Sequence, residues 1–119
     1  MSFITWVKSR FSHRGKALSL YRSGMAKANT HDYDAAIADY SAAIRAPNIP
    51  TDVKAMALYN RALAYSAIHE DEKSAEDLTA VLEMPGLRKN IRTEAQERRE
   101  RIRRRNESET DRAAQREHK

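Results

Sequence analysis

Two stretches of this chain repeat one another: ALSLYRSGMAKANTHDYDAAIADYSAAIRAP at residues 17–47 and AMALYNRALAYSAIHEDEKSAEDLTAVLEMP at residues 55–85. At an offset of 38 residues, 8 of the 31 aligned positions are identical, and Tyr21 and Tyr59 are one such pair. Ordinary amino-acid usage would give about two identities by chance. Each copy has apolar residues at helical spacing on either side of a short polar turn, so the sequence predicts two copies of one helical hairpin.

Repeated helix pairs stack side by side, which predicts an all-α fold with a concave face. The expected helices span residues 16–29, 33–46, 52–68, 71–84 and 88–105. Gly24 lies inside the first of them, where glycine costs about 1 kcal/mol against alanine, so we expect a neighbouring helix to approach closely there. The fifth helix has a thin apolar set, Leu87, Ile91, Ala95 and Ile102. It would open a third repeat, but no second helix follows it, so we expect it to cap the stack.

Composition divides the chain into three segments. Residues 1–15 are a basic amphipathic N-terminal segment, residues 16–105 are the helical domain, and residues 106–119 are a polar tail. The tail has no apolar periodicity, so we expect it to be disordered. The N-terminal segment has Phe3 and Phe11 among apolar residues at helical spacing. It would cover the open flank of the first repeat, fill the groove, or lie on a membrane interface.

The net charge of +5 is unevenly distributed along the chain. Residues 1–16 carry +4, residues 17–87 carry −4, residues 88–105 carry +6 and residues 106–119 carry −1. The second basic segment contains an arginine cluster: Arg98, Arg99, Arg101, Arg103, Arg104 and Arg105. Basic ends around an acidic body favour an acidic partner, nucleic acid or an anionic membrane surface. Alternatively, interspersed glutamates pair with these arginines along a solvated helix.

The residue inventory argues against catalysis. The sequence has no glycine-rich phosphate loop and no nucleophile motif, and its histidines are too scattered for a metal site. His31 and His69 recur because the turn recurs, which predicts a structural role. We therefore expect no enzyme activity, no cofactor and no metal. Cysteine is absent, no apolar run approaches the roughly 18 residues of a membrane span, and the apolar N-terminal residues precede the basic ones, the reverse of a secretory signal. We expect a cytoplasmic protein.

The two copies resemble the tetratricopeptide repeat, whose pattern is W-x2-L-G-x2-Y, then A-x3-F, then P. The first copy supplies Leu20, Gly24, Ala36, Tyr40 and Pro47, and the second supplies Leu58, Ala62, Tyr65, Leu78 and Pro85. Departures from the pattern occur at Ser23, Lys27, Arg61 and Ser74. The offset of 38 residues also exceeds the family's period, and the extra length fits in the loop after Pro47.

The resemblance implies stacked antiparallel helix pairs and a non-catalytic adaptor that binds a peptide or helix of a partner protein in a concave groove. The first helix of each pair would line this groove, with the candidate residues Leu18, Tyr21, Arg22, Met25, Asn29, Met56, Tyr59, Asn60, Leu63, Ser66, Lys89 and Arg92. One branch of the family clamps the terminal carboxylate of its partner. Tyr21 and Met25 stand where that branch has lysine and asparagine, so the clamp would be incomplete.

Two questions stay open at this level. Tyr21, Met25, Tyr59 and Leu63 form an apolar ridge that suits a partner's apolar side chains, or they are core residues. Two repeats are fewer than the three that such folds usually need, so the end helices or a homodimer would have to compensate. We expect protein binding as the function, and the alternative is an adaptor that docks its basic ends on nucleic acid or an anionic membrane.

Overall fold

The computed structural model describes the backbone of residues 3–118 and the side chains of residues 15–118. Over this part of the chain the fold is all-α, as expected, and contains no strand. Five helices follow one another: α1 (Phe3–Asn29), α2 (Tyr33–Arg45), α3 (Thr51–Ala67), α4 (Asp71–Leu82) and α5 (Lys89–Glu117). The internal helix ends lie within two residues of the predicted ones, whereas the outer ends of α1 and α5 do not.

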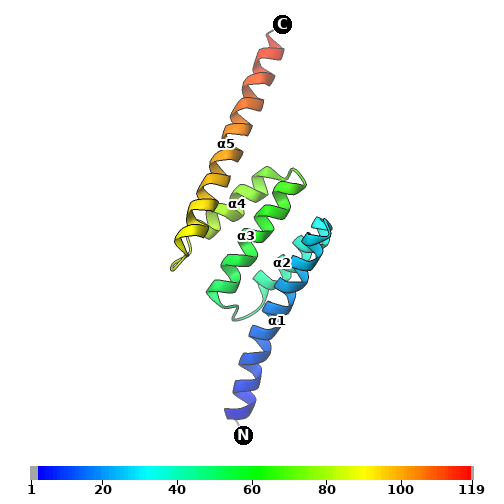
Figure 1. The fold of residues 1–119 in the computed structure, drawn as a ribbon, viewed down its shortest axis with the longest axis vertical. Helices are drawn as coiled ribbons and strands as arrows, with labels where there is room; N and C mark the ends of the chain where they lie inside the picture. Colours follow the sequence, from blue (N-terminus) through cyan, green and yellow to red (C-terminus); the bar gives the residue numbers. More distant parts are fainter. Residues whose placement is uncertain (1–2, 119) are drawn as a thin grey trace.

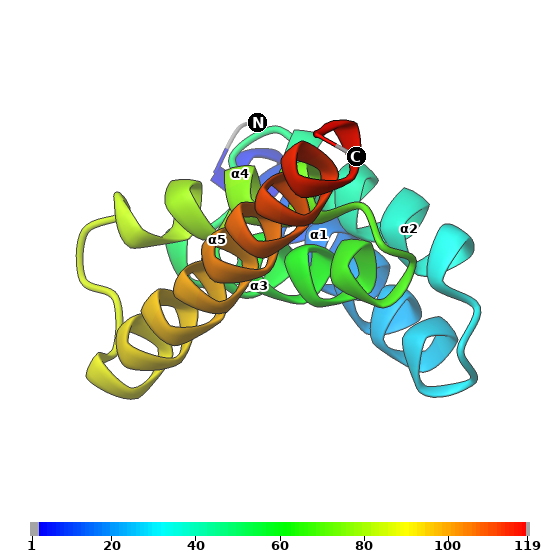
Figure 2. The same ribbon diagram turned by 90° about the horizontal axis from the view of Figure 1, so that it is seen from above.

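The helices form two antiparallel pairs followed by a single helix. Short turns at residues 30–32 and 68–70 join α1 to α2 and α3 to α4 (Figure 1). Each helix packs against the next one along the chain, and α1 also contacts α3. Seen from above, α2 and α4 lie on one side of the molecule, and α3, the C-terminal half of α1 and the first turns of α5 lie on the other (Figure 2). The molecule extends 76 Å along its longest axis and 29 by 20 Å across it.

The expected close approach at Gly24 is confirmed. A Cβ atom at this position would come within 2.6 Å of Tyr40 Cε1, which belongs to α2. The Tyr40 side chain is 1% exposed, and its ring packs against Tyr21 with the two centroids 6.0 Å apart. In the second repeat the same two positions hold Ala62 and Leu78, both buried. The second repeat therefore has a larger residue on its first helix, Ala62 in place of Gly24, and a smaller residue on its second helix, Leu78 in place of Tyr40.

The two hairpin turns share one geometry. His31 and His69 both have a φ of 64°, in the left-handed region. In each turn, the N–H of the following residue donates to a carbonyl oxygen five residues earlier, at 2.9 Å. This bond closes the end of a helix in the Schellman arrangement. The recurrence of histidine is therefore explained by its place in the turn.

The helix α5 occupies the place of the first helix of a third repeat. The side chain of Asn60 in α3 donates from Nδ2 to Tyr21 OH of α1 at 3.2 Å. One repeat later, Arg98 in α5 donates from Nε to Tyr59 OH of α3, also at 3.2 Å. Ile102 of α5 is buried in the same core cluster as Tyr59. The repeat thus extends into α5, which covers the open flank of α3 and α4 as the thin apolar set predicted.

The predicted boundary at residue 15 is wrong, because α1 is one continuous helix. Gly15 is its only glycine before Gly24, and the cost of about 1 kcal/mol for a glycine inside a helix is too small to end it. The first half of α1 extends away from the other helices (Figure 1). Residues 3–14, which we call the N-terminal arm, therefore do not fold back as a cover over the first helix pair.

The prediction of a disordered tail is also wrong, because residues 106–117 form the last turns of α5. The side chains of these residues are all exposed, so the helix arises from the local sequence rather than from packing. Neither glycine nor proline follows Gly86, and Arg103 forms an ion pair with Glu107 one turn later. Helix-forming residues and such pairs favour helix over disorder.

Candidate binding groove

An open hollow lies between α1, the start of α3 and the start of α5. Its volume is about 480 Å³. The residues around it are Leu18, Tyr21, Thr51, Asp52, Val53, Ala55, Met56, Pro85, Gly86, Leu87, Arg88 and Ile91. We call it the apolar hollow, because most of these side chains are apolar. Leu18 and Tyr21 are three residues apart on α1 and share a face, and the packing of α1 against α3 brings Met56 beside them.

A hydrogen bond from α3 holds Tyr21 in place at the edge of the apolar hollow. The Asn60 amide donates to Tyr21 OH and, at 2.8 Å, to the backbone oxygen of Met56. Burial raises the pKa of the Tyr21 phenol, and the bond from Asn60 opposes this only in part. The phenol is therefore neutral at pH 7 and presents an apolar ring with a satisfied hydroxyl.

A second hollow of about 90 Å³ lies between α3 and α5. It is lined by Leu63, Ser66, Ser74, Arg98, Arg101, Ile102 and Arg105, and we call it the arginine hollow. Arg105 donates two hydrogen bonds to the carboxylate of Asp71, at 3.0 and 3.1 Å. Arg98 lies 3.4 Å from Glu94. Arg101 forms no ion pair within residues 15–118. Of the three arginines in this hollow, it is therefore the one whose charge is available to an added anion.

Five of the predicted groove residues line the two hollows. Leu18, Tyr21 and Met56 meet in the apolar hollow, and Leu63 and Ser66 lie in the arginine hollow. Four others, Arg22, Met25, Asn29 and Lys89, are exposed outside both hollows. Thus only some of the residues that were predicted on the first helix of each pair line a hollow.

The remaining three predicted groove residues serve the fold. Tyr59 is 7% exposed and belongs to the core cluster beneath α5, so it is a core residue. The Asn60 amide donates hydrogen bonds to Tyr21 OH and to the backbone oxygen of Met56. Arg92 donates to the backbone oxygen of Leu82 and so satisfies the C-terminal end of α4. These side chains hold the walls together rather than face a ligand.

The sequence analysis missed part of the wall. Val53, Leu87 and Ile91 border the apolar hollow, yet Leu87 and Ile91 were expected only to cap the stack. Val53 and Ile91 lie in the first turns of α3 and α5, and Leu87 lies just before α5. Apolar spacing marks such residues as packed but does not show which neighbour they face. The loop after α4 brings Leu87 and Ile91 to the same hollow as Leu18 and Tyr21 of α1, which only the tertiary structure shows.

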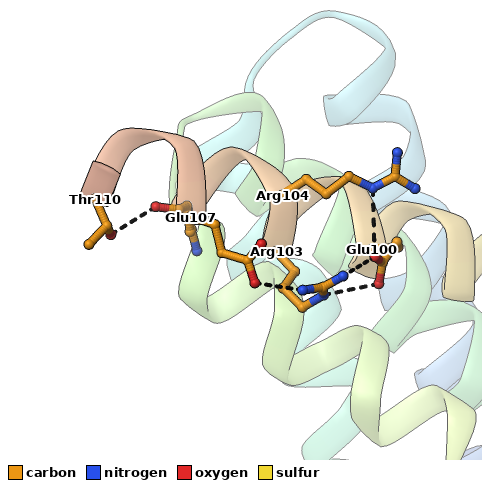
Figure 3. Close-up of polar contacts among 6 residues, drawn as sticks. Glu100, Arg103, Arg104, Glu107 and Thr110 are labelled. Atoms are coloured by element: carbon orange, nitrogen blue, oxygen red, sulfur yellow. Dashed lines mark hydrogen bonds and ion pairs between the residues drawn. The ribbon is translucent and has the colours of Figure 1, made fainter. Parts of the chain in front are cut away.

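Three arginines of the cluster, Arg98, Arg103 and Arg104, form ion pairs within α5. Arg103 forms ion pairs with Glu100 and Glu107, and Arg104 Nε lies 3.6 Å from Glu100 (Figure 3). The hydrogen bond from Arg103 holds the pKa of the Glu100 carboxyl below its usual value. Arg99 donates to Thr79 of α4 at 3.4 Å. These contacts favour the solvated-helix interpretation of the cluster.

The outward face of α5 is polar where the corresponding face of α3 is apolar. Leu58 and Ala62 of α3 belong to the core cluster that also holds residues of α4. The equivalent residues of α5, 38 positions later, are Gln96 and Glu100. A further helix packed there would have to bury the Gln96 amide and the ion-paired Glu100 carboxylate, which costs free energy. The stack of helices therefore ends at α5.

Among the described residues, no group of three or more histidine, cysteine, aspartate or glutamate side chains could hold a metal ion. Within the same part of the chain, each helix is too short or too polar to cross a membrane. Comparisons with protein-family models, with curated proteins and with solved structures give no match.

Proposed function

We propose that this chain is a non-catalytic protein-interaction module of tetratricopeptide-like repeats, which binds a peptide or helix of a partner protein. One observation carries the proposal: side chains from both repeats, Leu18, Tyr21 and Met56, converge on the apolar hollow. An open, mostly apolar hollow with a few polar groups at its edge is typical of sites that take a partner's apolar anchor. The absence of cysteine suits a reducing compartment, so we propose a cytoplasmic setting.

The two hollows together suggest what a partner segment would present. An apolar side chain would fill the apolar hollow, where burial of one leucine or phenylalanine contributes about 1.5–3 kcal/mol. Asp52 and Arg88 at its edge would fix the orientation of the segment. A carboxylate further along would meet Arg101 in the arginine hollow. We therefore expect a segment that combines an apolar anchor with an acidic residue.

Selection from a displayed peptide library tests this function. Peptides selected on the intact protein should be titrated calorimetrically against Leu18→Asp and Met56→Asp, which place a charge in the apolar hollow. Both variants should bind at least tenfold more weakly, while the control Ser19→Asp, at an exposed position of α1, should bind normally. Circular dichroism checks that the variants keep their helices. Selected peptides that bind all four proteins equally would refute the proposed site.

The second candidate function is an adaptor that docks its basic ends on nucleic acid or an anionic membrane. It is favoured by the projection of both helical ends from opposite sides of the body (Figure 1). Such binding would weaken steeply with salt. Replacing Arg103, Arg104 and Arg105 together by glutamine should reduce it. If the intact protein binds neither DNA nor anionic vesicles at low salt, this candidate is wrong.

A further inference from the structure

The N-terminal arm projects from the body of the molecule. Residues 3–14 continue α1 past the end of α2 and away from the other helices (Figure 1). The rest of α1 packs against α2 and α3. At 1.5 Å per residue the backbone of the arm is about 18 Å long. The backbone thus presents a short helix whose surroundings are set by its own sequence rather than by a neighbouring helix.

The sequence of the arm divides this helix into an apolar face and a polar face. At 3.6 residues per turn, four apolar residues fall within one arc of about 100°: Phe3, Ile4, Val7 and Phe11. The opposite side of the helix holds the hydroxyl residues Thr5, Ser9 and Ser12. Because α1 is continuous, all these positions share one helical register. The arm is therefore amphipathic.

Basic residues flank the apolar face of the arm. In the helical register Lys8 falls at one edge of this face and Arg10 at the other, and Arg14 falls three residues after Phe11. Trp6 falls beyond Arg10. Long basic side chains can bury their stems in lipid and keep the charge in water, and tryptophan is enriched where a membrane meets water. This pattern is typical of a helix that lies in the surface of a bilayer.

We propose that the N-terminal arm lies on an anionic lipid membrane, with its apolar face at the acyl chains and its bases at the lipid phosphates. The arm would thereby hold the helical body at the membrane surface. This inference rests on the second candidate function, which it narrows to one end of the chain and to one kind of partner. The peptide site in the apolar hollow does not depend on it.

Charge decides which occupant fits the apolar face. The helix α1 carries six basic residues and no acidic one, so it repels a second copy of itself and attracts anionic headgroups. DNA offers the same negative charge, but its phosphates have no use for an apolar face. The arm also differs from α5, where Arg103 and Arg104 pair with glutamates of their own helix.

The fluorescence of Trp6 reports on the arm directly, because the chain has no other tryptophan. With vesicles of equal parts phosphatidylserine and phosphatidylcholine, its emission should shift to shorter wavelength as the indole leaves water. Vesicles of phosphatidylcholine alone should give a much smaller shift, since they lack the negative surface potential. An unchanged emission with the anionic vesicles would overturn the proposal. A shift with duplex DNA but none with these vesicles would also overturn it and assign the arm to nucleic acid.

Two variants of equal charge separate insertion of the apolar face from general attraction. Phe11→Asp places a carboxylate on the apolar face, and the matched control Ser9→Asp places one on the polar face. In co-sedimentation with the anionic vesicles, Phe11→Asp should bind at least about tenfold more weakly than Ser9→Asp, as expected for one phenylalanine that no longer enters the lipid. Equal affinities of the two variants would overturn the proposal.

A variant of α5 distinguishes this proposal from the wider second candidate. Replacing Arg103, Arg104 and Arg105 together by glutamine leaves the arm unchanged, so it should weaken vesicle binding no more than about threefold. If this variant loses binding while Phe11→Asp keeps it, α5 is the membrane contact. The proposal for the arm then fails and the second candidate stands. Selected peptides should bind Phe11→Asp normally, so the peptide site is judged separately.

Discussion

Gly24→Ala offers the sharpest test of the packing between α1 and α2. A new Cβ atom would lie 2.6 Å from Tyr40 Cε1 and 2.7 Å from Tyr40 Cδ1, far inside ordinary contact. The Tyr40 ring is 1% exposed and packs against Tyr21, so it cannot easily move aside. Overpacking of this kind costs about 1–3 kcal/mol, and the better helix propensity of alanine returns about 1 kcal/mol. We expect the free energy of unfolding to fall by a net amount of up to about 2 kcal/mol.

Urea unfolding followed by circular dichroism measures this loss, and the chain supplies two controls. Gly15 lies in the same helix, but a Cβ atom there would meet nothing within 4 Å, so Gly15→Ala should stabilise by about 1 kcal/mol. The double variant Gly24→Ala with Tyr40→Leu recreates the alanine and leucine of the second repeat. It should be more stable than the sum of its single effects predicts, by about 1 kcal/mol or more.

Two results would refute the reasoning about Gly24. If Gly24→Ala stabilises the protein as much as Gly15→Ala does, the helices do not approach closely at this point. If the effects of Gly24→Ala and Tyr40→Leu simply add, the alanine does not clash with the tyrosine ring. Either outcome would also weaken the view that residue size is balanced between the two helices of each repeat.

Other predictions concern α5 and the acid stability of the first helix pair. Ile91 packs half-buried against the core cluster, so Ile91→Ala should cost about 2 kcal/mol, the low end for such a change, in urea unfolding. Truncation after Arg105 should cost less than about 0.5 kcal/mol, because it removes exposed residues and one pair within the helix; a large drop in melting temperature would contradict this. Hydrogen bonds from Lys27 and then Ser23 lower the pKa of Asp39. A lowered folded pKa gives stability that is present above the ordinary value of about 3.9 and is lost as the pH falls through the folded pKa. The advantage of the unmodified chain over Asp39→Asn should therefore shrink on acidification in urea midpoints, and a constant difference would exclude this coupling.

Sequence periodicity was sufficient for the helix pairs and for their internal ends, since each depends on local apolar spacing and turn residues. It was also sufficient for the close contact at Gly24. Glycine destabilises a helix interior, so its presence there indicates that another helix approaches closely. The outer ends of α1 and α5 were predicted wrongly. Charge and polarity suggested separate segments there, but the backbone continues as helix wherever neither proline nor a capping turn stops it.

The sequence by itself determined that Tyr21 and Tyr59 occupy equivalent positions on the first helix of each repeat. Only the tertiary structure decided their different roles. The short Asn60 side chain reaches Tyr21 from α3 and leaves the ring at the edge of the apolar hollow. The long Arg98 side chain reaches Tyr59 from α5, which buries that tyrosine in the core. Local sequence fixes the face on which a side chain lies, whereas its exposure depends on the residues that a neighbouring helix brings from 39 positions away.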